Sequence, residues 1–358
     1  MPDNLPTDDP LLPAAVMMTP LPELAAHALA RDANALAIEF EGVWHSWGEL
    51  AQVARATADL VDAAGVQQGA PIGFVARNHP ATVAALLGLI AAGHTIQMIY
   101  AFQSSAALAR DIDNLRSSAI VVMARDLSEP VRHAIARCGA AAVVLDGMSA
   151  IASPGLERTT VQCDDLRTAP QIEILTSGTT GPPKRFAISF DMIVRHHMGN
   201  VSMAGARTVD EADGPPFLLS FPLGNISGIY STLPTLLRGQ PVTLLERFSL
   251  SAWHAFILRY RPEASGLPPA GFQMLLDANI PPEDLISIKV MATGAAPLDP
   301  TVQRAFEDRY GIPILLSYGA TEFGGPVAAA DWPGSQTSRS YVLRAVKPMS
   351  PAQSSIRR

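Results

Sequence analysis

The residues with the clearest potential for chemistry form one short stretch, ILTSGTTGPPK, which runs from Ile174 to Lys184. Apolar residues lead into a loop of hydroxyl groups and glycines, and the loop ends in a cation. Glycines let backbone N–H groups approach an anion closely, and hydroxyl groups supply further donors. The composition is therefore typical of a phosphate-binding loop. It does not match the pattern of the P-loop NTPases, because Pro183 precedes the lysine and Arg185 follows it.

Two further stretches place small or polar residues after a predicted strand. In ATGAAP (residues 292–297), the small residues let a flat ligand lie against the backbone. In SYGATEFGG (residues 317–325), Tyr318 offers an aromatic face, Thr321 a hydroxyl group and Glu322 a carboxylate. Open α/β sheets bind ligands at the carboxyl ends of their strands. We therefore expect these two stretches and the phosphate loop to form one site.

The elements that must position this site follow an α/β pattern. Strands of continuous Val, Ile and Ala residues alternate with helices, which is typical of a parallel sheet covered on both faces. The strands are predicted at residues 71–76, 95–100, 119–123 and 141–145. After a connector at residues 146–170 and the loop, the alternation resumes and continues to Ser317. The sequence therefore predicts two α/β units of similar size.

The beginning of the chain carries local signals. A hairpin is predicted at residues 35–45 around Glu41-Gly42, followed by a helix with the capping-box pair Ser46 and Glu49. We expect residues 1–19 to form a flexible arm and residues 20–331 to form the folded body, with subdomains that divide near residues 170 and 171. Residues 332–358 hold no Asp or Glu and have no clear period, so we interpret them as an atypical tail. A truncated or frame-shifted gene would produce such a tail.

Composition excludes several classes of protein. The chain has 358 residues and a formal net charge of −7, which argues against a general nucleic-acid binder. Its two cysteines, Cys138 and Cys163, provide no disulfide framework, which indicates a reducing, cytoplasmic setting. We find no signal peptide and no continuous apolar stretch long enough for a membrane span, so we expect no stable membrane insertion.

The ordered motifs SGTTGPPK, ATGAAP and YGATE resemble those of the adenylate-forming enzymes. This superfamily includes acyl-CoA synthetases, the adenylation domains of peptide synthetases and firefly luciferase. HSWGEL (residues 45–50) and FPLGNISG (residues 221–228) are weaker matches in the expected order. The resemblance covers about residues 20–330. It implies a layered αβαβα N-terminal domain, built from two sheet-and-helix subdomains and an incomplete barrel-like part.

The resemblance also implies a reaction. A carboxylate attacks the α-phosphate of ATP to give an acyl-adenylate and pyrophosphate, and a thiol, most often coenzyme A, then takes the acyl group. The implied partners are a small-molecule carboxylate, ATP with Mg²⁺, and coenzyme A; a homodimer is compatible with the resemblance. Lys184, Thr321 and Glu322 would be the catalytic residues, with Thr321 at the α-phosphate and Glu322 on the metal, a role suited to a carboxylate.

Further residues receive binding roles from the same resemblance. The phosphates would be held by Thr176, Ser177, Gly178, Thr179, Thr180, Gly181 and Lys184. The adenine would lie between Gly294, Ala295 and Ala296 on one side and Tyr318, with Gly319 and Ala320 beside it, on the other. The acyl pocket would be lined by Asn225, Ser227 and Gly228.

The chain departs from the family pattern at several points. Arg185 and Phe186 follow the loop lysine, where the family usually has glycine, and Asn225 replaces an aromatic residue or His. We find no Tyr-x-Thr-Gly-Asp segment and no C-terminal domain with its catalytic lysine. Two alternatives therefore stay open: a degenerate or truncated nucleotide-binding fragment, and a stand-alone adenylation module that loads a carrier protein. The apolar character of the chain and the PLGNISG segment, which resembles that of the synthetases, favour a fatty or cyclic apolar acid over an amino acid.

Overall fold

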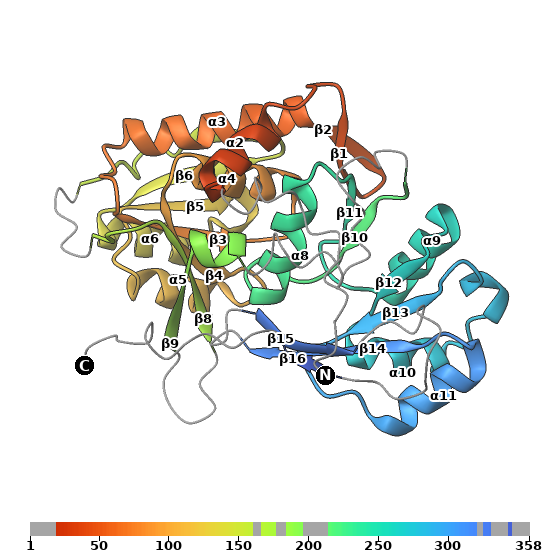
Figure 1. Cartoon of the computed structure of the whole chain (residues 1–358). Coiled ribbons are helices and arrows are strands. Elements are labelled where there is room, and N and C mark those ends of the chain that lie inside the picture. The colour runs from red at the N-terminus through yellow and green to blue at the C-terminus, as the bar shows by residue number, and fades with distance from the viewer. Residues whose placement is uncertain are drawn as a thin grey trace, which may run out of the picture.

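A computed structural model describes residues 19–159, 166–176, 184–195, 214–320, 325–330 and 343–345. Three sheets organise this part of the chain (Figure 1). The helices are α2 (Leu21–Leu29), α3 (Trp47–Ala63), α4 (Pro80–Ala91), α5 (Ser105–Asp113), α6 (Glu129–Cys138), α7 (Phe190–Ile193), α8 (Ile226–Leu237), α9 (Leu250–Tyr260), α10 (Pro269–Asp277) and α11 (Pro300–Tyr310), with 3₁₀ turns at Ala124–Asp126 and Pro282–Leu285.

The largest sheet has seven strands in the order β7-β6-β5-β3-β4-β8-β9. Its five central strands run parallel, whereas β7 and β9 pair antiparallel at the two edges. The strands are β3 (Pro71–Ala76), β4 (Thr95–Tyr100), β5 (Ala119–Met123), β6 (Ala141–Asp146), β7 (Ser149–Ala152), β8 (Gln171–Thr176) and β9 (Lys184–Ser189). The strands β3 and β5 are apolar throughout because helices cover both faces of the sheet, whereas β4 and β8 also carry the buried polar residues Gln97 and Glu173.

Two apolar clusters hold these helices to the sheet. On one face α2, α3, α4 and α8 share a core with alternate strand residues, and on the other face α5 and α6 form a separate core (Figure 1). The backbones of α3 and α4 approach closely at Gly88, where a Cβ would lie 2.3 Å from the carbonyl oxygen of Ala54. Glycine at this position therefore allows the two helices to pack this closely.

A four-stranded sheet in the order β10-β11-β1-β2 joins distant parts of the sequence. β1 (Leu36–Phe40) pairs in parallel with β11 (Val242–Leu244), which also pairs with β10 (Phe217–Leu219), and antiparallel with β2 (Val43–Ser46). The predicted hairpin and capping box are confirmed: the Ser46 hydroxyl accepts from the Glu49 N–H, and the Glu49 carboxylate accepts from the Ser46 N–H at 2.7 Å.

The remaining sheet has five strands in the order β12-β13-β14-β15-β16. β12 (Ala264–Gly266), β13 (Val290–Thr293) and β14 (Ile314–Ala320) run parallel, and β15 (Gly325–Ala330) and β16 (Leu343–Ala345) are antiparallel. Helices α9, α10 and α11 pack on this sheet through a third apolar cluster. The buried Trp253 indole donates to the Ser265 hydroxyl at 3.0 Å, which fixes α9 against β12.

The predicted α/β fold is confirmed, but the sheets cross the predicted division at residues 170 and 171. β8 and β9 complete the sheet of the first half, and β1 pairs with β11 of the second. The predicted connector at residues 146–170 contains β7, which was missed because an exposed edge strand needs no apolar pattern. Helix α7 follows β9 directly, and residues 196–204 lie outside the described part.

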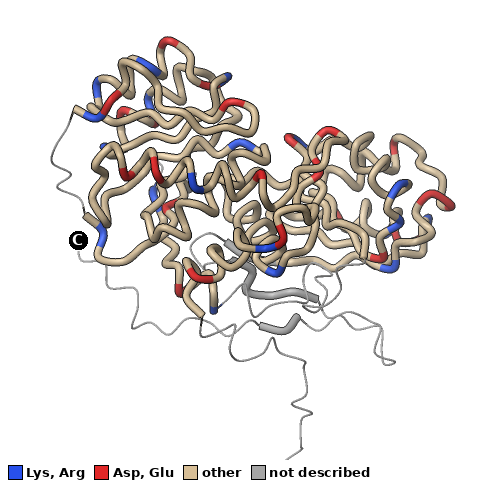
Figure 2. The backbone as a smooth tube through the Cα atoms, turned by 90° about the horizontal axis from the view of Figure 1, so that it is seen from above, with Lys and Arg blue, Asp and Glu red and all other residues tan. Residues whose placement is uncertain are grey.

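Acidic and basic residues are interspersed along the described backbone (Figure 2). Among the helices of the described ranges, none is both long and apolar enough to cross a membrane.

Candidate functional site

The predicted phosphate loop begins and ends on one antiparallel hairpin. β8 and β9 pair from Gln171↔Ser189 to Thr176↔Lys184, so Lys184 lies directly opposite the last strand residue before the loop. The Lys184 side chain is exposed at the loop end of the hairpin. Five predicted phosphate-binding residues of the loop lie outside the described part, so their phosphate contacts stay predictions. They are Ser177, Gly178, Thr179, Thr180 and Gly181.

A buried carboxylate anchors the base of this hairpin. Glu173 accepts hydrogen bonds from Gln97 Nε2 (2.8 Å), Arg167 Nε (2.6 Å) and Gln171 Nε2 (2.8 Å). Burial by itself raises the pKa of Glu173, but the hydrogen bonds to the carboxylate outweigh burial and bring the pKa below its usual value. The pairing of β4 with β8 ends at Gln97↔Glu173. The hairpin is therefore fixed at its base, and its outer half is not paired with β4.

Arg185 stands where the resembled family has glycine, and it faces away from the lysine beside it. Successive residues of a strand point to opposite faces, so Arg185 and Lys184 lie on different faces of the hairpin. The Arg185 Nη1 donates to the carbonyl oxygen of Met98 at 3.4 Å, one residue past the end of the β4–β8 pairing. Burial lowers the pKa of this guanidinium, while the carboxylates of Glu173 and Asp111 oppose that shift. We interpret Arg185 as a support of the hairpin.

The second predicted stretch follows β13, beside the end of β14. The two strands are parallel neighbours with Thr293 opposite Leu316, so Gly294 and Ser317 lie side by side at the same sheet edge. A Cβ on Gly294 would be 2.1 Å from the Ser317 hydroxyl oxygen, so a larger residue would displace the end of β14. The Ser317 hydroxyl donates to the Thr293 carbonyl at 3.0 Å. The structure thus brings two of the three stretches together.

Ala295 continues this edge in an unusual conformation. Its φ of 67° lies in the left-handed region, which disfavours residues with a Cβ. Ala295 and its neighbour Ala296 are both exposed. A strained small residue beside a strand end is typical of a ligand-binding turn, and the adenine contacts of Gly294, Ala295 and Ala296 stay predictions.

The third stretch leaves the described part soon after β14. Tyr318 and Gly319 belong to this strand, and their backbones pair with Ala328 and Pro326 of β15 across a register shift. Thr321 and Glu322 lie outside the described residues, as do the side chains of Thr176, Tyr318 and Ala320. In the described ranges no group of three or more His, Cys, Asp or Glu side chains forms a metal site. Metal binding by Glu322 therefore stays a prediction from the resemblance.

The predicted acyl-pocket segment leads from β10 into α8. Asn225 is the N-cap residue of α8; it is exposed, and its side chain makes no capping hydrogen bond. Ser227 is half-buried in the first turn. Gly228 is buried, and a Cβ there would lie 2.0 Å from the carbonyl oxygen of Pro222. Gly228 therefore has a packing role against its own preceding segment, whatever it contributes to a pocket.

The residues that fix this segment by hydrogen bonds and ion pairs carry no sequence motif. Asn78 follows β3 and is only 1% exposed, and its amide hydrogen-bonds to the backbone near the ends of β10 and β11. Its neighbour Arg77 pairs with Asp126 and Glu246, and the hydrogen bond to Asp126 raises the pKa of Arg77. Their position directly after an apolar strand was the only available signal, since Arg and Asn are ordinary loop residues.

Comparison with known proteins identifies the class. The model of the AMP-binding enzyme family matches residues 25–349, and the chain belongs to this family. The chain is 26% identical over 300 residues to 4-coumarate–CoA ligase 3 of Oryza sativa subsp. japonica, which covers 80% of this chain and 53% of that protein. It is 27% identical over 288 residues to sulfoacetate–CoA ligase of Cupriavidus necator, covering 78% of this chain and 55% of that protein.

A solved structure supports the same fold. ATP-bound MatB from Rhodopseudomonas palustris superposes with a TM-score of 0.70 at 20% identity, over 86% of this chain and 61% of MatB. The three sheets therefore form the fold of the N-terminal domain of acyl-CoA synthetases. The chain spans about half the length of the two curated relatives.

Proposed function

We propose that this protein activates a carboxylic acid with ATP, giving an acyl-adenylate and pyrophosphate, and that coenzyme A then accepts the acyl group. The proposal rests on one observation above all: the three motif stretches occur in order, at strand ends or beside them, in a chain that belongs to the AMP-binding enzyme family. Positioning and charge stabilisation supply most of the catalysis that phosphoryl and acyl-adenylate chemistry requires.

Each stretch has a role in this proposal. The loop from Thr176 to Lys184 binds the β- and γ-phosphates, and Lys184 neutralises part of their charge. Gly294 and Tyr318 enclose the adenine, because a residue without a side chain lets a flat ring approach the backbone closely. Thr321 contacts the α-phosphate, and Glu322 holds the Mg²⁺ that accompanies ATP.

The proposed acid is apolar, either fatty or cyclic, in a cytoplasmic setting. The segment FPLGNISG, which leads into α8, supplies apolar and small residues where the acid would lie. The relatives carry the names of 4-coumarate and sulfoacetate ligases, so acids of different polarity are known among similar proteins. Asn225, exposed at the start of α8, is the residue that would distinguish among them.

The test is ATP–pyrophosphate exchange with a panel of fatty, aryl, sulfonated and amino acids. Exchange with fatty or aryl acids supports the proposal, and exchange with amino acids alone would instead indicate an adenylation module. Mass-spectrometric detection of the acyl-CoA product tests the second step separately. Binding of ATP without exchange for any acid would refute the proposed activity.

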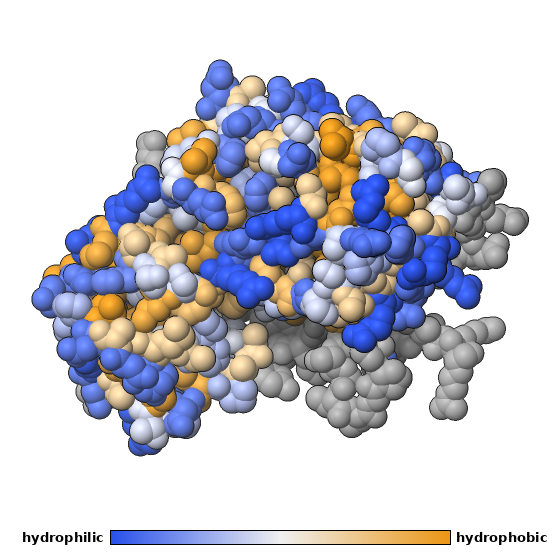
Figure 3. Space-filling view, turned by 180° about the vertical axis from the view of Figure 1, so that it is seen from behind, coloured by the Kyte–Doolittle hydropathy of each residue, from blue (hydrophilic) through white to orange (hydrophobic). Residues whose placement is uncertain are grey.

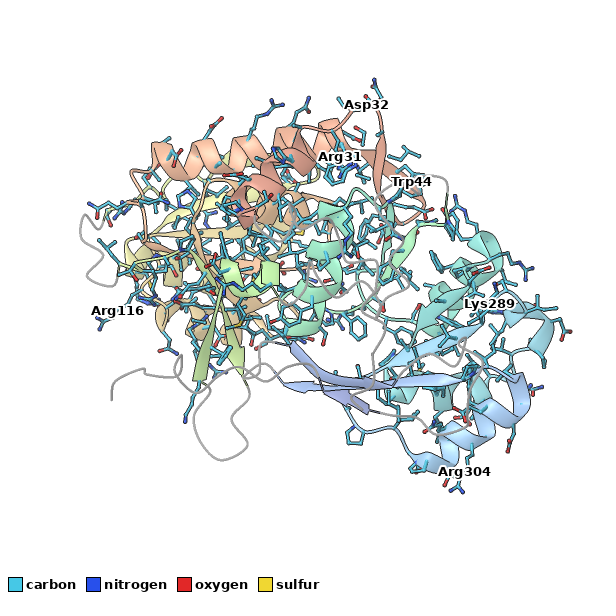
Figure 4. All side chains as sticks on the ribbon, viewed as in Figure 1. Arg31, Asp32, Trp44, Arg116, Lys289 and Arg304 are labelled. Carbon is cyan, nitrogen blue, oxygen red and sulfur yellow. The ribbon has the colours of Figure 1, made fainter. Side chains whose placement is uncertain are left out.

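Two variants test the assigned residues. Lys184→Ala and Glu322→Ala should each abolish exchange while leaving the folded protein intact. The matched control is Lys289→Ala, because Lys289 is also an exposed lysine, 61% accessible and paired with Glu263 on the part that carries the five-stranded sheet (Figure 4). Undiminished ATP–pyrophosphate exchange by Lys184→Ala would refute the proposed phosphate-binding role of the loop lysine.

A further inference from the structure

The side chain of Asn78 connects two sheets through three hydrogen bonds. Its Nδ2 donates to the carbonyl oxygens of Phe221 and Leu245, each at 3.0 Å, and its Oδ1 accepts from the N–H of Leu223 at 2.8 Å. Both amide hydrogens and the amide oxygen are thus used, as expected for a polar group that is 1% exposed. All three partners are more than 140 positions away in the sequence.

Two of these partners, Phe221 and Leu223, belong to the segment that the proposed acid would contact. β10 and β11 are parallel neighbours, and Phe221 and Leu245 lie just beyond their carboxyl ends. From Phe221 the chain passes through Leu223 and Gly224 to Asn225, the N-cap residue of α8. Asn78 therefore hydrogen-bonds to the backbone immediately before the predicted acyl-pocket residues.

Apolar packing also holds this segment, because Leu223 is 2% exposed within the core that it shares with α8. A Cβ on Gly224 would lie 3.3 Å from the Cβ of Ala76 and 3.5 Å from the Cα of Tyr100, so the segment rests on the carboxyl ends of β3 and β4. The side chain of Asn225 makes no capping hydrogen bond, whereas its backbone N–H closes the turn by donating to the Pro222 carbonyl oxygen at 3.0 Å. Steric contacts limit how closely the segment approaches the sheet, whereas hydrogen bonds of defined geometry set its position along the sheet.

An ion-pair cluster locks the same junction one residue away. Arg77 donates to Asp126 at 2.8 and 2.5 Å and to Glu246 at 2.9 Å, and Arg125 reaches Glu246 at 2.6 Å. Arg77 precedes Asn78, and Glu246 follows Leu245, so the two connections lie side by side. Seen from behind, strongly hydrophilic residues gather near the middle of the molecule (Figure 3). The ion pairs of this cluster connect the two sheets but do not contact Phe221 or Leu223. Asn78 is the residue that hydrogen-bonds to the segment that begins at Phe221.

We infer that Asn78 is a positioning residue for acid binding: it fixes residues 221–228 so that Asn225 and Ser227 present one defined wall to the acid. This inference rests on the proposed function, because it assigns that segment to the acid. Asn78 itself is buried behind the wall and needs no contact with the acid. Its loss would leave two carbonyl oxygens and one N–H unpaired, and the segment would then adopt several positions.

The test combines kinetics with hydrogen exchange on the purified chain. In Asn78→Ala, we expect the KM for the acid to rise about tenfold, as for a binding site that has lost a buried hydrogen bond. The KM for ATP should change by less than about twofold, because the segment does not belong to the nucleotide site. Amide exchange should accelerate in peptides from residues 217–230 and stay unchanged in β5 and β6.

Controls separate positioning from a general loss of stability. Thr57→Val removes another buried hydrogen bond, from the Thr57 hydroxyl to the Val53 carbonyl in α3, and should leave the KM for the acid unchanged. If Asn78→Ala does not fold, Asn78→Ser, which retains a small donor and acceptor, carries the same test. Equal changes in both KM values, or exchange at residues 217–230 no faster than in Thr57→Val, would overturn the inference. If the unmodified chain activates no acid, the proposed function fails. The amide hydrogen-exchange data alone then decide whether Asn78 positions the segment.

Discussion

His79 makes the stability of the fold depend on pH. It is the N-cap residue of α4, and its Nδ1 accepts a hydrogen bond from the N–H of Ala81 at 3.2 Å. The ring packs edge-on against Phe40 with the centroids 5.0 Å apart. Burial, and then the charge of Arg125, lower the pKa of His79 from 6.5 to about 4. Protonation of Nδ1 would also remove the acceptor that caps the helix.

The sign and size of the effect follow from this shift. Between the two pKa values the unfolded chain binds more protons than the folded chain, so the free energy of unfolding decreases as the pH falls. From pH 7 to pH 5 the full shift corresponds to about 2 kcal/mol. The ring is partly exposed, and solvent screening reduces this to about 1 kcal/mol.

The perturbation that tests this reasoning is His79→Asn, because asparagine is a good N-cap residue and does not titrate. Urea denaturation followed by tryptophan fluorescence should show that the unmodified protein loses about 1 kcal/mol more than the variant between pH 7 and pH 5. The control His133→Asn replaces an exposed histidine of α6 and should behave like the unmodified protein. Equal losses in His79→Asn and the unmodified protein would refute the argument.

Three further substitutions probe packing, strain and buried charge. Gly228→Ala should lower the free energy of unfolding by about 1–3 kcal/mol, despite the higher helix propensity of alanine, because its Cβ would meet the Pro222 carbonyl; unchanged urea denaturation would contradict this. Ala295→Gly should raise the thermal midpoint slightly, by relieving the φ of 67°, and a lower midpoint would count against strain. Glu39→Ala should cost about 2–3 kcal/mol in urea denaturation, because Arg259 and two hydroxyl groups lose a buried acceptor, and Glu39→Gln should cost less.

The sequence predicted best those elements that are buried on every side. The strands predicted at residues 71–76, 95–100 and 119–123 coincide with β3, β4 and β5, because their continuous apolar runs reflect helices on both faces. Short or exposed strands such as β7 and β12 carry no such signal. The pairing of β1 with β11 joins segments some 200 residues apart, and hydrophobic pattern alone does not specify which of several short strands become neighbours.

The residues of the candidate site also differ in how well the sequence predicts them. Gly294 and Tyr318 are predicted as site residues because each belongs to a recognisable motif at a strand end, and the parallel pairing of β13 with β14 brings the two motifs together while their adenine contacts stay predictions. Asn78 carries no motif, and its partners lie far along the chain, so its role emerges only from the hydrogen bonds. The sequence shows Arg185 only as a departure from the family pattern. The face of the hairpin on which its side chain lies follows from the pairing of Arg185 with Leu175 in the structure.

The candidate site draws on all three sheets, so its geometry depends on how the sheets are joined. Apolar packing links them, but apolar contacts are non-directional and tolerate small displacements. Buried polar groups are more exacting, since an unpaired donor or acceptor costs free energy. Asn78 provides such a link between the seven- and four-stranded sheets, and Glu39 provides another, from β1 to Arg259 and Tyr260 of α9. Because both links are directional, they favour one relative arrangement of the end of β8, the segment after β10 and the carboxyl end of β13, which a ligand bound across three sheets would require.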